Sequence, residues 1–230
     1  MPSNLSKKEL HDIIQWDVKT WSRALNFWEQ NADLSAGKTV LAIGEREGGL
    51  SLWLAQKGLK VTCTDYNDFP STTEKMHQDY GVSDLIEYHN KVDVTDLSRY
   101  PDNHFDFVVF KSVIGVLSEK DRQQKALDEI YRVLKDGGSL IFAENLKATK
   151  LHGWLRKKFI RWNHYWRYLH LKDDMDLFSK FQKRIYKTEG FLSNFGRSEK
   201  QRSLLAGFDK SVKWMTPKSW RYVLMGVLTK

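Results

Sequence analysis

Apolar and polar positions follow one another in blocks typical of strands and helices along the first two thirds of the chain. Short apolar runs predict buried strands at 38–44, 60–64, 85–89, 105–111 and 139–144. Helical spacing falls between them, at 50–57, 71–80 and 121–135. Strands that alternate with helices form parallel sheets with right-handed crossovers, so the pattern predicts a doubly wound, mostly parallel α/β fold.

The two flanks of this pattern differ from its centre. Apolar and aromatic residues recur at helical spacing over 5–30, as Ile13, Trp16, Trp21, Leu25 and Trp28. Residues 146–221 are aromatic, basic and predicted to be mostly helical, and 222–228 is predicted to be an edge strand. We expect one domain over 1–230, with N-terminal helices at 1–36, a core at 37–146, a helical insertion at 147–221 and a final strand at 222–230.

Charge is divided unevenly along the chain. The net charge is +8, but residues 147–230 hold 20 Lys and Arg against 6 Asp and Glu, a net of +14, which leaves −6 for the rest. The basic part is expected to meet a phosphorylated substrate, a membrane surface or a nucleic acid, or to be a solvated face. A single cysteine, Cys63, excludes an internal disulfide. No apolar run reaches the length of a signal peptide or membrane span, so a cytoplasmic location is expected.

A glycine turn and an acidic residue provide the first indication of function. Gly44 follows the first predicted strand, and Gly48 and Gly49 open the next helix. Glycine permits a sharp turn and close approach of the backbone to a ligand. Asp65 ends the second strand, 21 residues after Gly44, where a carboxylate can accept both hydroxyls of a ribose. The alternative is an ordinary turn and a surface aspartate.

Four segments resemble the class I S-adenosylmethionine (SAM)-dependent methyltransferases over residues 38–146. They are VLAIGEREGG, VTCTDYND, KVDVTDLSRYPDNHFDFVVFKSVIGVL and LDEIYRVLKDGGSLIFAEN. The resemblance implies a seven-stranded sheet with an N-terminal helical segment and a helical basic insertion before the last strands. It also implies SAM as cofactor and no metal, with cofactor contacts from Gly44, Glu45, Arg46, Gly48, Asp65, Tyr66, Asp93, Val94 and Lys111.

The sequence departs from the family pattern in two places. Ala42 stands where the family usually has an acid, and Arg46 stands where it usually has a second glycine. The Arg46 side chain is therefore expected either to point away or to pair with the methionine carboxylate of the cofactor. The missing acid leaves open a non-catalytic SAM-binding subunit that works through a partner.

Methyl transfer requires alignment of the acceptor atom with the sulfonium methyl and exclusion of water. A hydroxyl acceptor would also need a general base. The candidates are His152 and Glu144, followed by His164 and His170. The competing interpretation makes each histidine a surface or packing residue.

Residues 154–172 are predicted to form a basic amphipathic helix. Its apolar face would carry Leu155, Phe159, Trp162, Trp166 and Leu169, with Arg156, Lys157, Arg161, Arg167 and Lys172 mostly opposite. Such a helix can dock on a sugar or glycan acceptor, lie on the inner face of a membrane, or pack on the protein itself.

The leading hypothesis is O-methylation of a sugar or glycan, such as a surface polysaccharide or its lipid-linked or phosphorylated precursor. The segment WDVKTWSRALNFWE loosely resembles methyltransferases of such pathways, which also favours this hypothesis. The alternative acceptor is a membrane-borne quinone or lipid. Nucleic acid is favoured by charge alone and is not the expected partner, and the oligomeric state is left open.

Overall fold

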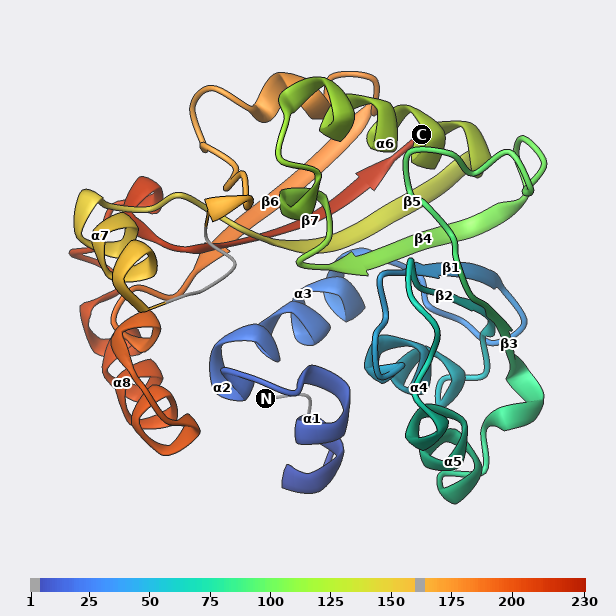
Figure 1. Ribbon diagram of the computed structural model, residues 1–230, viewed down its shortest axis with the longest axis horizontal. Helices are drawn as coiled ribbons and strands as arrows, with labels where there is room; N and C mark the ends of the chain where they lie inside the picture. Colours follow the sequence, from blue (N-terminus) through green and yellow to red (C-terminus); the bar gives the residue numbers. More distant parts are fainter. Residues whose placement is uncertain (1–4, 160–163) are drawn as a thin grey trace.

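The computed structural model describes residues 5–159 and 164–230 and places one seven-stranded sheet between two layers of helices (Figure 1). The strand order is β3-β2-β1-β4-β5-β7-β6. All neighbours are parallel except the β5–β7 and β6–β7 pairs, which are antiparallel. The predicted α/β class and the mostly parallel sheet are confirmed.

Six of the seven strands overlap a predicted strand, although β5 begins five residues earlier than predicted, and β6 was not predicted. The strands are β1 (Thr39–Ile43), β2 (Lys60–Thr64), β3 (Ile86–His89), β4 (Phe105–Lys111), β5 (Leu134–Asn145), β6 (Lys183–Glu189) and β7 (Val223–Thr229). Strand β7 is not the edge strand that the sequence predicts, because β6 pairs along its whole length. Strand β6 also lies within the insertion that was predicted to be helical.

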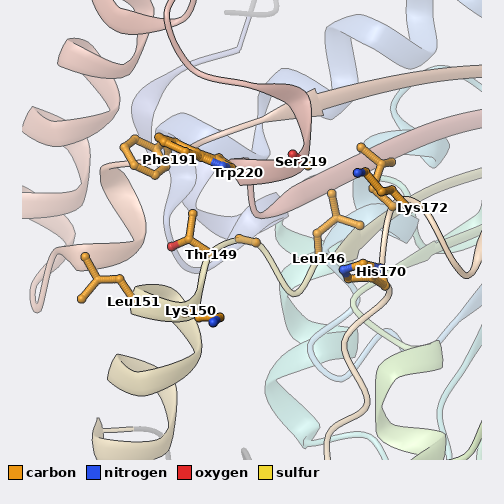
Figure 2. Close-up of a pocket in the computed structure, with 11 residues that line it drawn as sticks. Leu146, Thr149, Lys150, Leu151, His170, Lys172, Phe191, Ser219 and Trp220 are labelled. Carbon is orange, nitrogen blue, oxygen red and sulfur yellow. The ribbon is translucent and has the colours of Figure 1, made fainter.

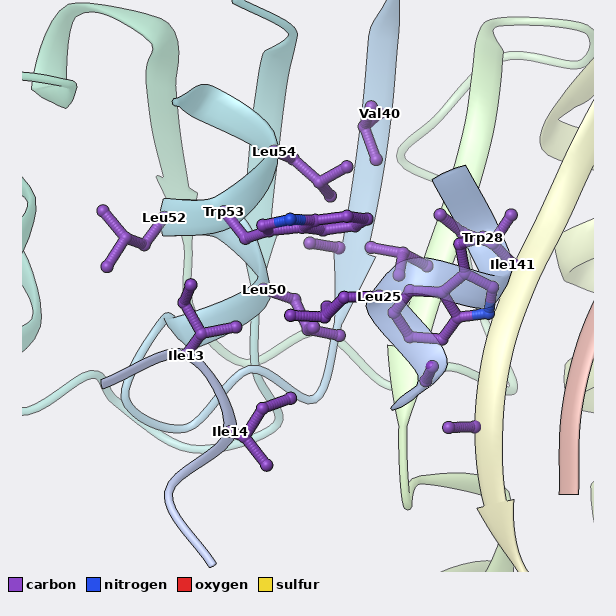
Figure 3. Packing of buried hydrophobic residues seen from close by; sticks show 14 of the residues in the cluster. Ile13, Ile14, Leu25, Trp28, Val40, Leu50, Leu52, Trp53, Leu54 and Ile141 are labelled. Carbon is purple, nitrogen blue, oxygen red and sulfur yellow. The ribbon is translucent and has the colours of Figure 1, made fainter. Parts of the chain in front are cut away.

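Helices cover both faces of the sheet. The N-terminal segment forms α1 (Lys7–Ile14), α2 (Val18–Trp21) and α3 (Arg23–Asn31), and the core adds α4 (Gly49–Ala55), α5 (Ser71–Asp79) and α6 (Lys120–Val133). Helices α1, α3 and α4 pack on one face, where the Trp28 and Trp53 ring centroids lie 5.8 Å apart (Figure 3). Helix α6 packs on the other face, around Phe110 and Phe142. This packing fixes the carboxyl ends of the parallel strands.

The insertion differs most from its prediction. Helix α7 (Lys150–Phe159) includes only the first part of 154–172, and residues 165–172 are not helical. Leu169 instead forms a parallel bridge with Leu146, directly after β5. The single amphipathic helix is therefore wrong, and the predicted positions Arg161 and Trp162 lie outside the described residues. The insertion also contains α8 (Glu199–Val212).

Candidate active site

The loop between β1 and α4 turns through three left-handed backbone conformations. The φ angles are +66° at Gly44, +51° at Arg46 and +75° at Gly48. A Cβ at Gly44 would lie 2.5 Å from Val113 Cγ2, and one at Gly48 would lie 2.6 Å from His77 Cε1. Both glycines are therefore required by conformation and by space. Arg46 stands where the family usually has a glycine, and its backbone nevertheless adopts the left-handed conformation that favours glycine.

Asp65 directly follows β2 and is held by backbone amides. Its Oδ2 accepts a hydrogen bond from the Arg46 amide at 2.9 Å, and its Oδ1 accepts one from the Asn67 amide at 2.8 Å. The side chain is nearly buried. The Asn67 side-chain amide also donates to Oδ1, at 3.3 Å. A carboxylate has about four acceptor positions, so these three bonds orient Asp65 and leave capacity for a ligand hydroxyl.

Most of the predicted cofactor residues meet at one cavity of about 420 Å³, which we call the cofactor crevice. Its lining contains Gly44, Arg46, Asp65, Tyr66, Asp93 and Val94. The Asp93 carboxylate accepts from the Thr95 amide and hydroxyl at 2.8 and 2.9 Å, and the Tyr66 ring is mostly exposed. The crevice therefore combines two carboxylates with apolar and aromatic walls.

A smaller recess of about 220 Å³ adjoins the crevice through Gly44, Arg46, Ser112 and Trp166. It contains the other predicted charged residues, Glu45 and Lys111. Burial raises the pKa of Glu45 to about 7, against hydrogen bonds from Ser51 and the charge of Lys111. Burial lowers the pKa of Lys111 to about 8, opposed by Glu45. Gly48 lines neither cavity, and its carbonyl lies 2.9 Å from His77 Nε2.

Sequence reasoning missed the apolar wall of the crevice. Val113, Val116 and Leu117 line it, from the short turn of helix η2 (Ile114–Leu117) after β4. Trp166 lines both the crevice and the recess, and it packs where a side chain at Gly115 would collide with it. The apolar run 113–117 could have predicted that Val113, Val116 and Leu117 form this wall. No feature of the sequence predicted that Trp166 lies at the crevice.

A third cavity of about 820 Å³, the arginine cavity, opens beside the recess. Both are lined by Gln15, Trp16 and Arg46. Its remaining lining residues are Glu47, Asn145, Arg156, Phe159, Tyr168, Asn194, Gly196, Arg197 and Arg202. Four arginines thus face one acidic side chain, next to the cofactor crevice and at the carboxyl end of β5.

The two leading candidates for a general base are both engaged in the scaffold. His152 is fully buried on α7, with Nδ1 2.7 Å from Thr149 Oγ1 and Nε2 2.9 Å from the Phe191 carbonyl oxygen. Burial lowers the pKa of His152 to about 4. Neither nitrogen is open to an acceptor, so the geometry favours a packing role over proton transfer.

Glu144 is also fully buried, at the end of β5. Its Oε2 accepts hydrogen bonds from the Val113 and Ile114 amides, both at 2.9 Å, and its Oε1 accepts one from the Asn145 amide. Burial raises its pKa to about 7, against these backbone hydrogen bonds. The side chain anchors the start of helix η2 to β5, which is a positioning role beneath the crevice.

The remaining histidine candidates lie elsewhere. His170 faces the Asp173 carboxylate and lines an outer cavity of about 550 Å³. Figure 2 shows this cavity between the start of α7 and the loops that carry His170, Phe191 and Trp220. It shares no lining residue with the cofactor crevice, so its size does not make it a site of methyl transfer. His164 lines none of these cavities.

The strand order, the glycine turn, the Asp65 carboxylate at the end of β2 and the Asp93 carboxylate in the loop after β3 define a class of nucleoside-binding α/β domains. Residues 41–142 match the family model described as "Methyltransferase domain". Over this segment, which is less than half of the chain, the protein is similar to that family, and its fold is the one shared by the class I SAM-dependent methyltransferases, which use SAM as cofactor.

Curated relatives match part of the chain. The ubiquinone/menaquinone biosynthesis C-methyltransferase UbiE of Hydrogenovibrio crunogenus is 30% identical over 149 residues, 61% of this chain and 54% of that protein. The ubiquinone biosynthesis O-methyltransferase of Pseudomonas syringae pv. tomato is 31% identical over 137 residues, 59% of this chain and 53% of that protein. The chain thus matches about half the length of these relatives.

The fold is also found among solved structures. Phosphoethanolamine N-methyltransferase 2 of Haemonchus contortus, in complex with SAM, superposes with a TM-score of 0.63 at 16% identity, over 91% of this chain and 52% of that one. At this identity the likeness concerns the fold alone. It confirms the expected architecture and leaves the acceptor open.

The residues of the crevice fit SAM chemically. Asp65 and Asp93 offer carboxylates for the ribose and adenine ends, and Val94, Val113 and Leu117 offer apolar contact for the adenine ring. The recess offers Lys111 and Glu45, whose opposite charges match the carboxylate and ammonium of the methionine part. Glu45 thus supplies a carboxylate although Ala42 does not.

Proposed function

We propose that the protein methylates a small quinone-type or lipid-type molecule that reaches the cofactor crevice through the arginine cavity. The contact between these two sites is the observation that carries the proposal, because Arg46 lines the crevice, the recess and the arginine cavity. When bound, SAM supplies an activated methyl on a positively charged sulfur. The chain's own residues would align the acceptor with it, and Gln15, Trp16 and Trp166 would keep water from the passage.

The relatives support this acceptor class over the sugar or glycan favoured by the sequence. The two curated proteins above are named for ubiquinone and menaquinone biosynthesis, and no relative described here is named for a polysaccharide. The polysaccharide hypothesis therefore takes second place. It retains one supporting observation, the aromatic and cationic side chains around the arginine cavity.

The surface of the insertion supports an acceptor that is presented at a membrane. Nine of the eleven large apolar side chains exposed among the described residues belong to 147–221: Leu151, Trp154, Phe159, Tyr165, Leu204, Phe208, Trp214, Met215 and Trp220. The same segment carries most of the positive charge. Exposed aromatic residues among lysines and arginines favour the interface of an anionic bilayer. None of the helices over 5–159 and 164–230 is long and apolar enough to cross a membrane.

A labelling experiment tests the acceptor class. The protein is incubated with methyl-labelled SAM and separate lipid, glycan and RNA fractions of a cell extract. We expect label in the organic-solvent phase of the lipid fraction. Label in the glycan fraction would replace the proposal with the polysaccharide hypothesis. SAM binding without transfer to any fraction would favour a non-catalytic subunit.

Sedimentation with vesicles tests the membrane contact separately. Wild-type protein should sediment with vesicles that contain about 30% anionic lipid and less with neutral vesicles, since surface charge attracts basic segments. Replacing Trp154 and Trp214 by serine should reduce sedimentation with both. Equal sedimentation of wild type and variant would remove this part of the proposal.

A further inference from the structure

The arginine cavity contains a buried cation with no carboxylate partner. Arg156 lies on α7 with only 3% of its surface exposed. Its Nη1 donates to the Leu146 and Lys147 carbonyl oxygens at 2.8 and 3.3 Å. No acidic side chain within 5–159 and 164–230 forms an ion pair with it. Carbonyl oxygens carry only partial charge, so most of the positive charge of this arginine is not neutralised.

One nitrogen of this cation and the hydroxyl of the tyrosine beside it have no hydrogen-bond partner among the described residues. The Nη2 of Arg156 and the hydroxyl of Tyr168 are both buried, and neither is bonded within the part of the chain that the structure describes. The Arg156 guanidinium lies 4.1 Å from the centroid of the Tyr168 ring, and both residues line the arginine cavity. Buried polar groups usually have a hydrogen-bond partner, which can be a bound ion, a ligand or a water molecule. One donor of an arginine fork and one hydroxyl suit an oxyanion.

The rest of the cavity strengthens the positive field. Arg197 lies over the Phe159 ring at 3.3 Å, and Arg202 is 3.8 Å from the Glu199 carboxylate. That carboxylate already accepts two hydrogen bonds, from the Asp17 and Val18 amides, so it compensates Arg202 only in part. Glu47 is the one acidic side chain of the lining. The cavity is therefore built to receive negative charge.

We propose that Arg156 and Tyr168, with Arg197 and Arg202, bind a carboxylate or phosphate group of the methyl acceptor. The inference rests on the proposed function, because it makes the arginine cavity the place where the acceptor is anchored. Arg46 lies between this anion site and the cofactor crevice. The acceptor is thus an anionic member of the proposed quinone-type or lipid-type class, with its charged end at Arg156 and its reacting atom toward Arg46. An arginine fork gives orientation as well as affinity, which methyl transfer requires.

Direct anion binding tests the site without SAM or acceptor. Inorganic phosphate and benzoate are titrated into the whole protein at low chloride and followed by NMR. Wild type should bind at least one of them. Arg156→Gln should weaken binding by about tenfold or more, the scale of a charge-assisted hydrogen bond. Binding of phosphate alone identifies a phosphate-bearing acceptor, and binding of benzoate alone identifies a carboxylate.

Three further variants separate the site from general charge and from folding. Lys157→Gln removes one positive charge from the neighbouring residue of α7, which is exposed and does not line the cavity, and should bind anions like wild type. Arg197→Gln and Tyr168→Phe keep the scaffold intact if Arg156→Gln unfolds, and each should weaken binding several-fold. All folded variants should keep the wild-type affinity for SAM.

The inference and the proposed function fail in different ways. It is overturned if wild type binds neither anion at about 10 mM, well above the concentration expected for a paired arginine site. It is also overturned if Arg197→Gln and Tyr168→Phe bind like wild type, or if Lys157→Gln loses as much affinity as they do. Anion binding without methyl transfer to the lipid fraction would contradict the proposed function and leave the anion site in place.

Discussion

The cofactor crevice and the arginine cavity meet at Arg46 but differ in whether their buried charged groups have partners. Around the crevice, the carboxylates of Asp65 and, beneath it, Glu144 accept hydrogen bonds from backbone amides. The Lys111 side chain faces Glu45. In the arginine cavity, Arg156 is buried on carbonyl oxygens, and its second nitrogen is unpaired among the described residues. The buried charges around the crevice thus have partners within the protein, whereas the buried charge of Arg156 in the arginine cavity has no carboxylate partner among the described residues.

This difference separates the generic part of the enzyme from the specific one. A site for a constant ligand can be arranged by backbone amides at strand ends, as for Asp65. A site for one particular acceptor needs side chains added around that frame, and here the insertion provides Arg156, Arg197 and Arg202. The predictions below test each side of this contrast.

The largest effect is expected at Gly44. Gly44→Val forces a β-branched residue to φ +66° and drives its Cβ to 2.5 Å from Val113 Cγ2. We expect SAM binding to fall below detection and stability to fall by roughly 3 kcal/mol or more. Gly37→Val is the matched control, since its φ is +86° with open space around it. It should lose stability and keep SAM affinity, and calorimetry with thermal melts compares the two.

The next effect concerns pH and His152. Its folded pKa of about 4 lies below the ordinary 6.5, so unfolding takes up a proton between these values. Stability present above pH 6.5 should therefore be lost as the pH falls toward 4, by up to about 3 kcal/mol. His152→Gln should flatten this part of the curve, measured by urea unfolding. A general base would instead show in the pH profile of turnover.

A smaller effect is expected at Asp65. Asp65→Ala removes the carboxylate at the end of β2 and should weaken SAM binding by about 1–3 kcal/mol. Asp68→Ala removes an exposed carboxylate three residues later, paired with Lys91, and should not change the affinity. Titration calorimetry on folded protein measures both. Equal affinities for Asp65→Ala and wild type would remove the ribose assignment.

The smallest effect is expected at Arg46 and compares strain with charge. Arg46→Gly relieves a left-handed conformation, whereas Arg46→Gln keeps it, and both remove the charge. The glycine variant should be more stable than the glutamine variant by about 1 kcal/mol, seen as a higher Tm. Both should bind phosphate more weakly than wild type. A glycine variant that melts below the glutamine variant would show that the φ of Arg46 is not a source of strain.

The core could be predicted from sequence because its signals are local. Strands β1, β2 and β4 are short apolar runs, and the glycine turn and Asp65 stand at their ends. Strand β6 was missed because Lys183–Glu189 is rich in charge, and because β7, its only strand partner among the described residues, lies far along the chain. An edge strand with polar side chains contains no apolar run from which it could be predicted.

The anion site could not be predicted for a related reason. Helical spacing placed Arg156 opposite the apolar stripe, where a solvated side chain is expected. Its burial depends on the carbonyl oxygens of Leu146 and Lys147, and backbone partners leave no trace in residue type. The bridge between Leu146 and Leu169 ends the predicted long helix in the same way, through a backbone contact between distant segments.

The attachment of α8 to the N-terminal helices has a consequence for the order of folding. The Glu199 carboxylate accepts hydrogen bonds from the Asp17 and Val18 amides, 182 and 181 residues away, and Tyr222 donates its hydroxyl proton to Asp17. Closing such loops costs chain entropy before any contact repays it, so contacts of this range form late. During synthesis, Asp17 and Val18 emerge early but gain these partners last. The arginine cavity should therefore take shape only after the sheet that holds the cofactor crevice has formed.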